Sequence, residues 1–281
     1  MMYIAEETIE KLIREDVPYI DLTSLVVGID HQEGVMRYST REEAVLCGTE
    51  EAQRILLKLG CQVRSFVASG AIVQPGDTVL EAMGPAGRLH MAWKVTANLL
   101  EYCSGVATRT KRLIDLARMV NPHIQVVTTR KSVPGSKDIS VKGMIAGGGL
   151  PHRLGLSETI LVFRQHLNFI GGIEGLLMKL DDMKRRCCEK KILVEVESLD
   201  EALRLSAAGV DGIQFDKFSL EKLQQAVDEI RKINPQVTLI GTGGINEKNV
   251  AQYASTGIDV INTSSVFFGK PIDMAVTIDE R

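Results

Sequence analysis

Cationic side chains gather in two short, glycine-containing stretches near the middle of the chain. Arg130 and Lys131 follow the apolar, β-branched run 124–129, and His152 and Arg153 follow three consecutive glycines. Arginine binds anions strongly, and glycine lets the backbone approach a ligand closely. The stretches lie at the ends of predicted strands and on loops, where ligands of α/β folds usually bind. The pattern therefore predicts a site for a small anion. A solvated basic loop with ordinary turn glycines is the alternative.

Two acidic side chains end apolar strands further along the chain. Glu195 lies in the run 192–197, and Asp216 closes the following apolar strand. Acids at the carboxyl ends of barrel strands are often catalytic, and half-buried acids need a partner such as a divalent cation, sugar hydroxyls or nearby cations. We therefore expect functional roles for both. Two non-functional alternatives stay open. Glu197 could be an exposed helix cap, and Asp216 could form a surface ion pair with Lys217.

A glycine-rich turn near the C-terminus predicts a phosphate site. Residues 239–249 have the pattern of a strand, a glycine turn and a helix start that Asn246 can cap. Free backbone amides at a helix start bind phosphate, and in α/β barrels the last two strand–helix loops commonly form such a site. A plain left-handed turn is the alternative. The candidate phosphate-binding residues are Thr242, Gly243, Gly244, Ser264 and Ser265.

The elements that must position these residues change character along the chain. Before residue 104, helices and half-covered strands follow one another without a βα rhythm, which predicts a small α+β layer. A long helix runs from residue 91 toward Ser104-Gly105. Beyond it, short apolar strands alternate with amphipathic helices, which predicts parallel strands with helical crossovers. About six such units, with the glycine turn near the C-terminus, favour an α/β barrel over an open doubly wound sheet. The six expected strands are 125–129, 159–163, 192–197, 212–215, 237–241 and 259–263.

Composition limits the class of protein. The 281 residues carry a formal net charge of −3, which gives no reason to expect nucleic acid or an anionic membrane as a partner. The five cysteines form no CxxC pair, which fits a reducing cytosol better than a disulfide framework. No apolar run reaches transmembrane length. We therefore expect a soluble, cytoplasmic protein.

In order and spacing, these segments resemble the quinolinate phosphoribosyltransferase family, also called nicotinate-nucleotide pyrophosphorylase (carboxylating), over nearly the whole chain. Within that family, the runs 47–52, 92–95 and 156–163 are similar to the ModD group, which is associated with molybdenum-transport genes. The resemblance implies phosphoribosyl transfer from phosphoribosyl pyrophosphate, with Mg²⁺, to the ring nitrogen of a heterocyclic acid. Pyrophosphate and carbon dioxide leave in the family's reaction.

The resemblance also implies an architecture. It predicts an N-terminal α/β sandwich domain over residues 1–104 and a C-terminal six-stranded α/β barrel over residues 105–269. The tail 270–281 is a candidate to return to the first domain. The family further implies a homodimer, or a higher multiple, in which one subunit's N-terminal domain completes the other's site.

The family's functional roles carry over by position. Acceptor carboxylates would be bound by three cationic side chains, Arg130, His152 and Arg153. Lys131 would reach the substrate and the pyrophosphate, while Glu195 and Asp216 would hold ribose hydroxyls and Mg²⁺. The glycine turn and the two serines would line the 5-phosphate pocket. These roles suit a transition state that is positive at the anomeric carbon and increasingly negative on pyrophosphate.

Two positions depart from the family's pattern. An arginine that reaches across the dimer is Lys94 here, and a lysine of the substrate pocket is Phe163. Lysine keeps the charge but loses the planar fork. Losing one cation and replacing an arginine by a lysine weakens binding of a dianion by several kcal/mol, at roughly 1.5–3 kcal/mol per charged hydrogen bond. The acceptor is therefore expected to be less charged or more apolar than quinolinate. The alternative is compensation by Lys137 or Lys142.

Two functions remain after these observations. The leading one is a pentosyltransferase that uses phosphoribosyl pyrophosphate and a small heterocyclic acceptor other than quinolinate. The second is a non-catalytic phosphate- or oxyanion-binding module linked to molybdate transport. A protein that has lost cations for the acceptor but keeps a phosphate site also fits that role. Release of pyrophosphate in the presence of heterocyclic acids separates the two.

Overall fold

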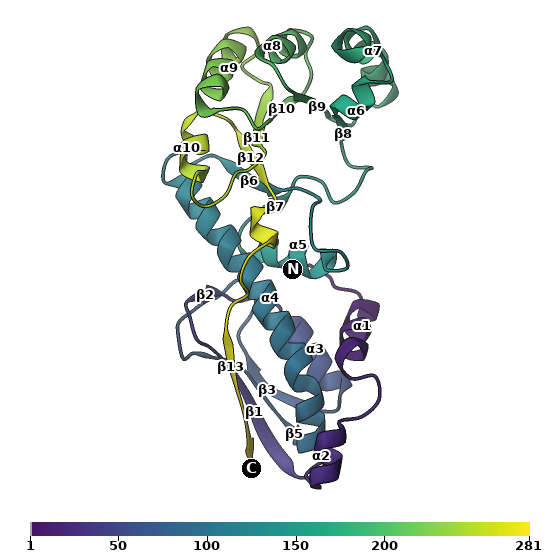
Figure 1. Cartoon of the computed structure of the whole chain (residues 1–281), viewed down its shortest axis with the longest axis vertical. Coiled ribbons are helices and arrows are strands. Elements are labelled where there is room, and N and C mark those ends of the chain that lie inside the picture. Colours follow the sequence, from purple (N-terminus) through teal and green to yellow (C-terminus); the bar gives the residue numbers. More distant parts are fainter. Residues whose placement is uncertain (1) are drawn as a thin grey trace. The chain divides into compact units, whose positions relative to one another are not determined.

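A computed structural model describes residues 2–281, which divide into two compact units (Figure 1). The first unit comprises residues 2–111, Ser132–Gly148 and Val266–Arg281, and the second comprises Arg112–Lys131 and Gly149–Ser265. The predicted domain boundary after residue 104 stays a prediction. In the part of the chain from residue 2 onward, no helix is long and apolar enough to cross a membrane.

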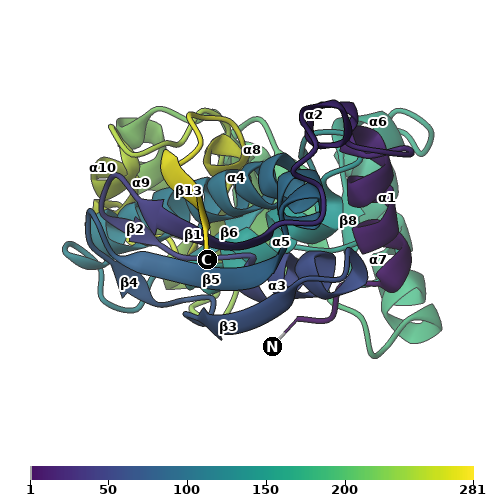
Figure 2. The same ribbon diagram turned by 90° about the horizontal axis from the view of Figure 1, so that it is seen from below.

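A four-stranded antiparallel sheet forms the framework of the first unit. Its strand order is β13-β1-β5-β3, and Figure 2 shows these strands side by side. The strand β13 lies in the C-terminal tail and pairs with β1 from Gly34↔Glu280 to Thr40↔Met274. Side chains at alternate positions of β1, including Met36 and Tyr38, are fully buried. The strands are β1 (Glu33–Thr40), β3 (Gln62–Phe66), β5 (Thr78–Pro85) and β13 (Met274–Glu280), with a separate small ladder of β2 (Ala44–Val45) and β4 (Ile72–Val73).

The long helix does not end at Ser104-Gly105, as the sequence suggested. It continues to Arg118, and Gly105 lies inside the helix at a close contact. A Cβ atom at Gly105 would lie 3.1 Å from the Cα of Pro271 and 3.3 Å from the carbonyl oxygen of Lys270, so glycine lets the C-terminal segment pass against the helix. The helices that begin in the first unit are α1 (Glu6–Asp16), α2 (Leu22–Val27), α3 (Thr49–Lys58), α4 (Ala86–Arg118) and α5 (Lys137–Ala146).

A parallel sheet forms the second unit, and it has seven strands where six were predicted. The order is β7-β6-β12-β11-β10-β9-β8, so β7 and β8 are edges and the sheet is an incompletely closed half-barrel. The unexpected strand is β7, Leu150–Pro151, which pairs with β6. Two residues carry too little periodicity to be recognised, and proline, which has no N–H to donate, is tolerated at an edge. The other strands are β6 (Gln125–Thr128), β8 (Ile160–Val162), β9 (Ile192–Val196), β10 (Gly212–Asp216), β11 (Thr238–Thr242) and β12 (Val260–Thr263).

Amphipathic helices cover the outside of this sheet (Figure 1). The helix α9 buries Leu223, Ala226, Val227 and Ile230, a spacing that places all four on one face. On the inner side, apolar residues from five strands pack together, namely Val127, Leu161, Leu193, Ile240 and Val260. The covering helices are α6 (Arg164–Leu167), α7 (Gly172–Arg186), α8 (Leu199–Ala207), α9 (Leu220–Ile233) and α10 (Val250–Ser255).

A buried lysine ties α5 to α3 in the first unit. Lys142 is 5% exposed, and its Nζ lies 2.7 Å from Glu50 and also bonds to Glu51. Burial alone raises the pKa of Glu50, but hydrogen bonds from Lys142 and Ser69 outweigh that effect and lower the pKa to about 2. The charge of Lys142 is therefore matched within its own unit.

Replacing this lysine should destabilise the fold. Lys142→Met leaves Glu50 and Glu51 without their cation, and the expected loss is about 3 kcal/mol in the free energy of unfolding at pH 7. The folded-state pKa of Glu50 lies below its ordinary value of 4.5, so its stabilisation is present above pH 4.5 and is lost as the pH falls toward 2. The difference between wild type and variant should shrink over that range.

Urea unfolding at pH 7 and at lower pH checks this expectation. Lys179→Met, at an exposed position of α7, is the matched control and should change the free energy by less than about 0.5 kcal/mol. A loss for Lys142→Met no larger than that of the control would contradict the role given to Lys142.

Candidate active site

A cavity of about 660 Å³ opens where the strands of the second unit end. Parallel strands place their carboxyl ends at one edge, so residues far apart in sequence meet there. Of the sequence-predicted site residues, all except Lys94 line this cavity. They are Arg130, Lys131, His152, Arg153, Phe163, Glu195, Asp216, Thr242, Gly243, Gly244, Ser264 and Ser265.

Three cationic side chains of the cavity form no ion pair with a carboxylate. Within residues 2–281, no ion pair involves Arg130, Lys131 or Arg153. Burial lowers the pKa of the Arg153 guanidinium, and the charge of Arg130 lowers it further, so these two groups repel each other. Burial, with the charge of Arg153, also lowers the pKa of His152, which is therefore neutral at pH 7. Unpaired cations facing one cavity favour an anionic ligand.

The two predicted carboxylates both face the cavity. Oε2 of Glu195 accepts a hydrogen bond from Nε2 of Gln214 at 2.7 Å. Burial raises the pKa of Glu195, the hydrogen bond from Gln214 opposes this, and the charge of Asp216 raises the pKa again. Asp216 lies 3.4 Å from Nζ of Lys217, so the ion pair left open by the sequence is present. The Lys217 side chain is 76% exposed, and such a pair is weak enough to leave Asp216 available.

The neighbouring acid Glu197 does not belong to this cavity. It is exposed and forms an ion pair with Arg164, the first residue of α6. Among residues 2–281, no three His, Cys, Asp or Glu side chains gather closely enough to hold a metal ion on their own. A metal held by Glu195 and Asp216 would therefore take its remaining ligands from substrate or water.

The glycine turn lies against the end of β10. Gly243 and Gly244 have φ values of 87° and 77°, in the left-handed region that favours glycine. A Cβ on Gly243 would lie 2.5 Å from Oδ1 of Asp216 and 2.8 Å from the backbone nitrogen of Lys217, whereas one on Gly244 would meet nothing within 4 Å. Gly243 is thus required by packing as well as by backbone conformation.

Asn246 is not the helix cap that the sequence suggested. The helix α10 begins at Val250, and the residue before it is Asn249. The Asn249 side chain accepts a hydrogen bond from the backbone of Asn246, and Asn246 in turn accepts one from Lys248. The residues between the glycines and α10 fold into a local turn, so any anion-binding amides here belong to the turn itself.

Two buried amide side chains were missed as site residues. Gln214 and Asn262 are each 3% exposed and line the cavity. Nδ2 of Asn262 donates to Oε1 of Gln214 at 3.2 Å and lies 3.4 Å from Nδ1 of His152. A polar amide inside an otherwise apolar strand is the signal that could have identified both. The alternating side-chain direction of β-strands does not reveal which polar groups meet across a sheet.

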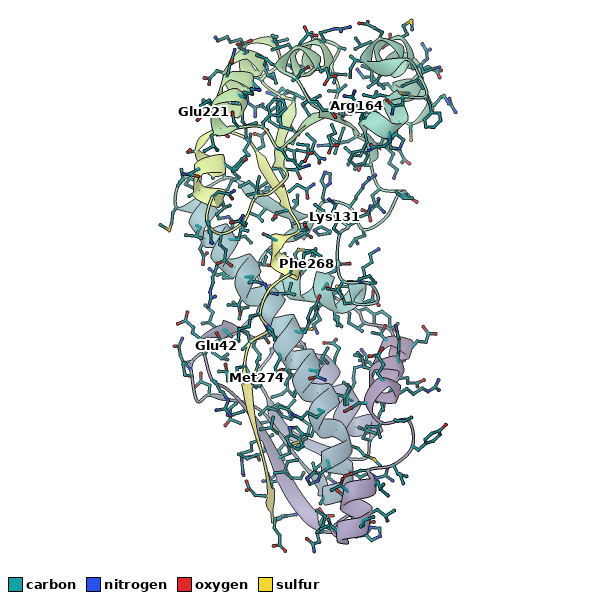
Figure 3. The ribbon with its side chains drawn as sticks, in the orientation of Figure 1. Glu42, Lys131, Arg164, Glu221, Phe268 and Met274 are labelled. Atoms are coloured by element: carbon teal, nitrogen blue, oxygen red, sulfur yellow. The ribbon has the colours of Figure 1, made fainter. Side chains whose placement is uncertain are left out.

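Phe163 occupies the position where the resemblance would place a cation. It is half-buried beside the apolar interior, and the guanidinium carbon of Arg153 lies 5.7 Å from its ring centroid. Figure 3 labels Lys131, after β6, and Arg164, which begins the short helix α6. Neither Lys137 nor Lys142 lines the cavity, and Lys142 is held by two glutamates in the first unit.

Lys94 belongs to the first unit. Its side chain is exposed, with Nζ 4.6 Å from the centroid of the Trp93 ring. It is not among the residues that line the cavity. Its role in completing a partner subunit's site stays a prediction.

Two models of one protein family match the chain. Residues 21–104 match the N-terminal domain of quinolinate phosphoribosyl transferase, and residues 106–277 match its C-terminal domain. The chain belongs to the quinolinate phosphoribosyltransferase family. It is similar to ModD of Pasteurella multocida (strain Pm70), a protein whose pyrophosphorylase activity is not established, with 34% identity over 281 residues and 100% of both chains covered. The family resemblance drawn from the sequence, including its ModD group, is confirmed.

Two further relatives carry the name of one enzyme. The human nicotinate-nucleotide pyrophosphorylase (carboxylating) is 30% identical over 256 residues, covering 90% of this chain and 84% of the human protein. The solved structure of the nicotinate-nucleotide pyrophosphorylase from Francisella tularensis superposes with a TM-score of 0.89 at 26% identity, covering 99% and 98% of the two chains. The predicted combination of an N-terminal sheet domain with a parallel α/β barrel is therefore confirmed, apart from the strand count.

A matched pair of glycine variants tests the geometry of the turn. Both Gly243→Ala and Gly244→Ala force alanine into a left-handed conformation, at a cost of about 1–2 kcal/mol each. Only Gly243→Ala must also displace Asp216 and Lys217. We expect it to lower the free energy of unfolding by about 1–3 kcal/mol more than Gly244→Ala, as overpacked sites do. Urea unfolding of the pair provides the measurement, and equal losses would contradict the close contact.

Proposed function

We propose that the protein transfers ribose-5-phosphate from phosphoribosyl pyrophosphate to the ring nitrogen of a heterocyclic acid other than quinolinate. The observation that carries this proposal is the cavity itself, which combines unpaired cations, two carboxylates and a glycine turn. The nicotinate-nucleotide pyrophosphorylases among its relatives support a pentosyltransferase. The replacement of a cation by Phe163 is the reason to propose a different acceptor.

The charges of the cavity suit this reaction. Breaking the bond between ribose and pyrophosphate leaves positive charge at the anomeric carbon and negative charge on the departing pyrophosphate. Glu195 and Asp216 would stabilise the first, and Lys131 would stabilise the second. Arg130, His152 and Arg153 remain to orient the acceptor, and the 5-phosphate would lie at the glycine turn. Fixed charges in a partly buried cavity act more strongly than the same charges in water.

Magnesium fits the donors that Glu195 and Asp216 provide. Mg²⁺ prefers oxygen ligands and is commonly held by one or two carboxylates together with phosphate oxygens of a substrate. Among residues 2–281, no cluster of three His, Cys, Asp or Glu side chains could hold a metal, which is consistent with an ion that takes its other ligands from the substrate. When bound, the ion would neutralise charge on the leaving pyrophosphate.

Donor binding is the first property to test. Phosphoribosyl pyrophosphate should raise the melting temperature only when Mg²⁺ is present, because a ligand that binds the folded state stabilises it. Asp216→Asn removes a charged ligand with little change in shape and should abolish most of that shift. Asp228→Asn, at an exposed position of α9, is the matched control. A full shift in Asp216→Asn would remove Asp216 from the proposed site.

We also propose that the enzyme acts as a homodimer, or a multiple of one, with Lys94 of the partner subunit completing each site. The observations behind this are the exposure of Lys94 and its absence from the cavity of its own chain. In a two-fold assembly, each subunit can supply one such residue to the other.

Mixed dimers test this arrangement. Lys94→Ala and Arg130→Ala should each be inactive alone, yet a mixture should recover about a quarter of wild-type activity, because half of randomly assembled dimers contain one intact composite site of two. Subunit exchange is verified by mass spectrometry of the mixed species. No recovery after verified exchange would mean that each chain carries a complete site.

A further inference from the structure

Two loops of the cavity meet beyond the point where their strands stop pairing. The glycine turn, residues 243–246, follows β11, and the serine pair, residues 264–265, follows β12. The ladder between these parallel strands has its last pair at Thr242↔Asn262. Within residues 2–281, no backbone–backbone hydrogen bond joins one loop to the other. The sheet therefore brings the two loops together, but backbone pairing does not fix their relative position.

The hydroxyl of Thr263 supplies a link between the loops. Its Oγ1 donates to the carbonyl oxygen of Ile245 in the glycine turn at 2.7 Å and accepts from the backbone N–H of Ser265 at 3.0 Å. A hydroxyl has one hydrogen and two lone pairs, so it can serve a carbonyl oxygen and an N–H at the same time. Thr263 is 4% exposed, so water competes little for these two hydrogen bonds.

The glycine turn is held within itself, so one tether can position it. The side-chain amides of Asn246 and Asn249 both donate to the carbonyl oxygen of Gly244. Thr263 is the last residue of β12, and a β-branched side chain at the end of a paired strand has few accessible rotamers. The Thr263 hydroxyl therefore sets where the glycine turn lies relative to the serine pair.

Both loops offer unpaired amides to the cavity. The backbone N–H groups of Gly243, Gly244 and Ser264 donate to no acceptor within residues 2–281, and all three residues line the cavity. The Ser265 amide, by contrast, is bonded to Thr263. Consecutive N–H groups in a left-handed turn favour a bound anion, and a phosphate has enough oxygens to accept from two loops at once. How well one phosphate fits both loops depends on the spacing between them.

We propose that Thr263 is a positioning residue for phosphate, whose hydroxyl holds the glycine turn and the serine pair at the spacing that one phosphate ester requires. This inference rests on the proposed function, which places the 5-phosphate of the donor at these loops. Thr263 acts through the loops, because its hydroxyl is already committed to Ile245 and Ser265. Removing the hydroxyl should therefore weaken the binding of a sugar phosphate.

Binding of ribose 5-phosphate to the intact protein, measured by isothermal titration calorimetry, tests this role. Thr263→Val keeps the branched shape without the hydroxyl, and we expect at least about tenfold weaker binding, as misplaced binding groups cause. Thr263→Ser keeps the hydroxyl and should bind within about threefold of wild type. Thr256→Val is the matched control, because it removes a buried hydroxyl of the same unit, bonded to Tyr253 outside the cavity, and should leave the affinity unchanged.

Amide NMR signals give a readout that a general loss of stability does not produce. In wild type, ribose 5-phosphate should shift the signals of Gly244 and Ser264 with one shared affinity, because one phosphate accepts from both loops. In Thr263→Val at saturating ligand, only one of the two signals should shift as far as in wild type, because the spacing is lost. Signals that follow two different affinities in wild type would overturn the inference without reference to any variant.

The other outcomes separate this inference from the proposed function. Equal affinity of wild type and Thr263→Val overturns the role of Thr263 and leaves the transfer reaction in place. Absence of ribose 5-phosphate binding in wild type overturns both the role and the location of the 5-phosphate. Weaker binding in Thr263→Val with recovery in Thr263→Ser, in a protein that releases no pyrophosphate with any heterocyclic acid, supports the role of Thr263 and overturns the transfer reaction. Thr263→Ala carries the same test if circular dichroism shows that Thr263→Val does not fold.

Discussion

Parallel pairing of seven short strands is the constraint on which the cavity depends. Because all strands of the second unit run in one direction, their carboxyl ends meet at one edge. His152 and Asn262, 110 residues apart in sequence, come within 3.4 Å of each other there. Below that edge the interior is apolar, and the polar groups lie above it. The sheet therefore supplies both the assembly of the site and the low-dielectric floor that strengthens its electrostatic interactions.

The two units differ in how their charged side chains are paired. In the first, Lys142 is matched by two glutamates, so the cluster stabilises the fold and has no charge left for a ligand. In the second, Arg130 and Arg153 lie near each other, and neither forms an ion pair within residues 2–281. Such an arrangement costs stability and persists where a bound anion offsets the repulsion. The contrast is the physical reason to place binding in the second unit.

Six of the seven strands could be predicted, because their apolar runs and the helices between them have clear periods. Strand β7 could not, since Leu150–Pro151 is too short to show a period. The long helix was predicted only toward Ser104-Gly105, whereas it continues to Arg118, and Gly105 makes room for Pro271. Charged residues at strand ends were identified as site candidates because a charged group that is even partly buried needs a partner. Gln214 and Asn262 were missed, because only their contacts across the sheet mark them as site residues, and the sequence does not show those contacts.

Transfer to nitrogen is the central claim, and the chemical fate of the ribose tests it most directly. Phosphoribosyl pyrophosphate labelled with carbon-13 at the anomeric position, with Mg²⁺ and heterocyclic carboxylic acids, can be followed by NMR. The account predicts a new anomeric signal coupled to a ring nitrogen labelled with nitrogen-15, with an equal amount of pyrophosphate. Donor that binds but is recovered unchanged with every acceptor would contradict it, and would favour a module that binds phosphate or oxyanions without catalysis.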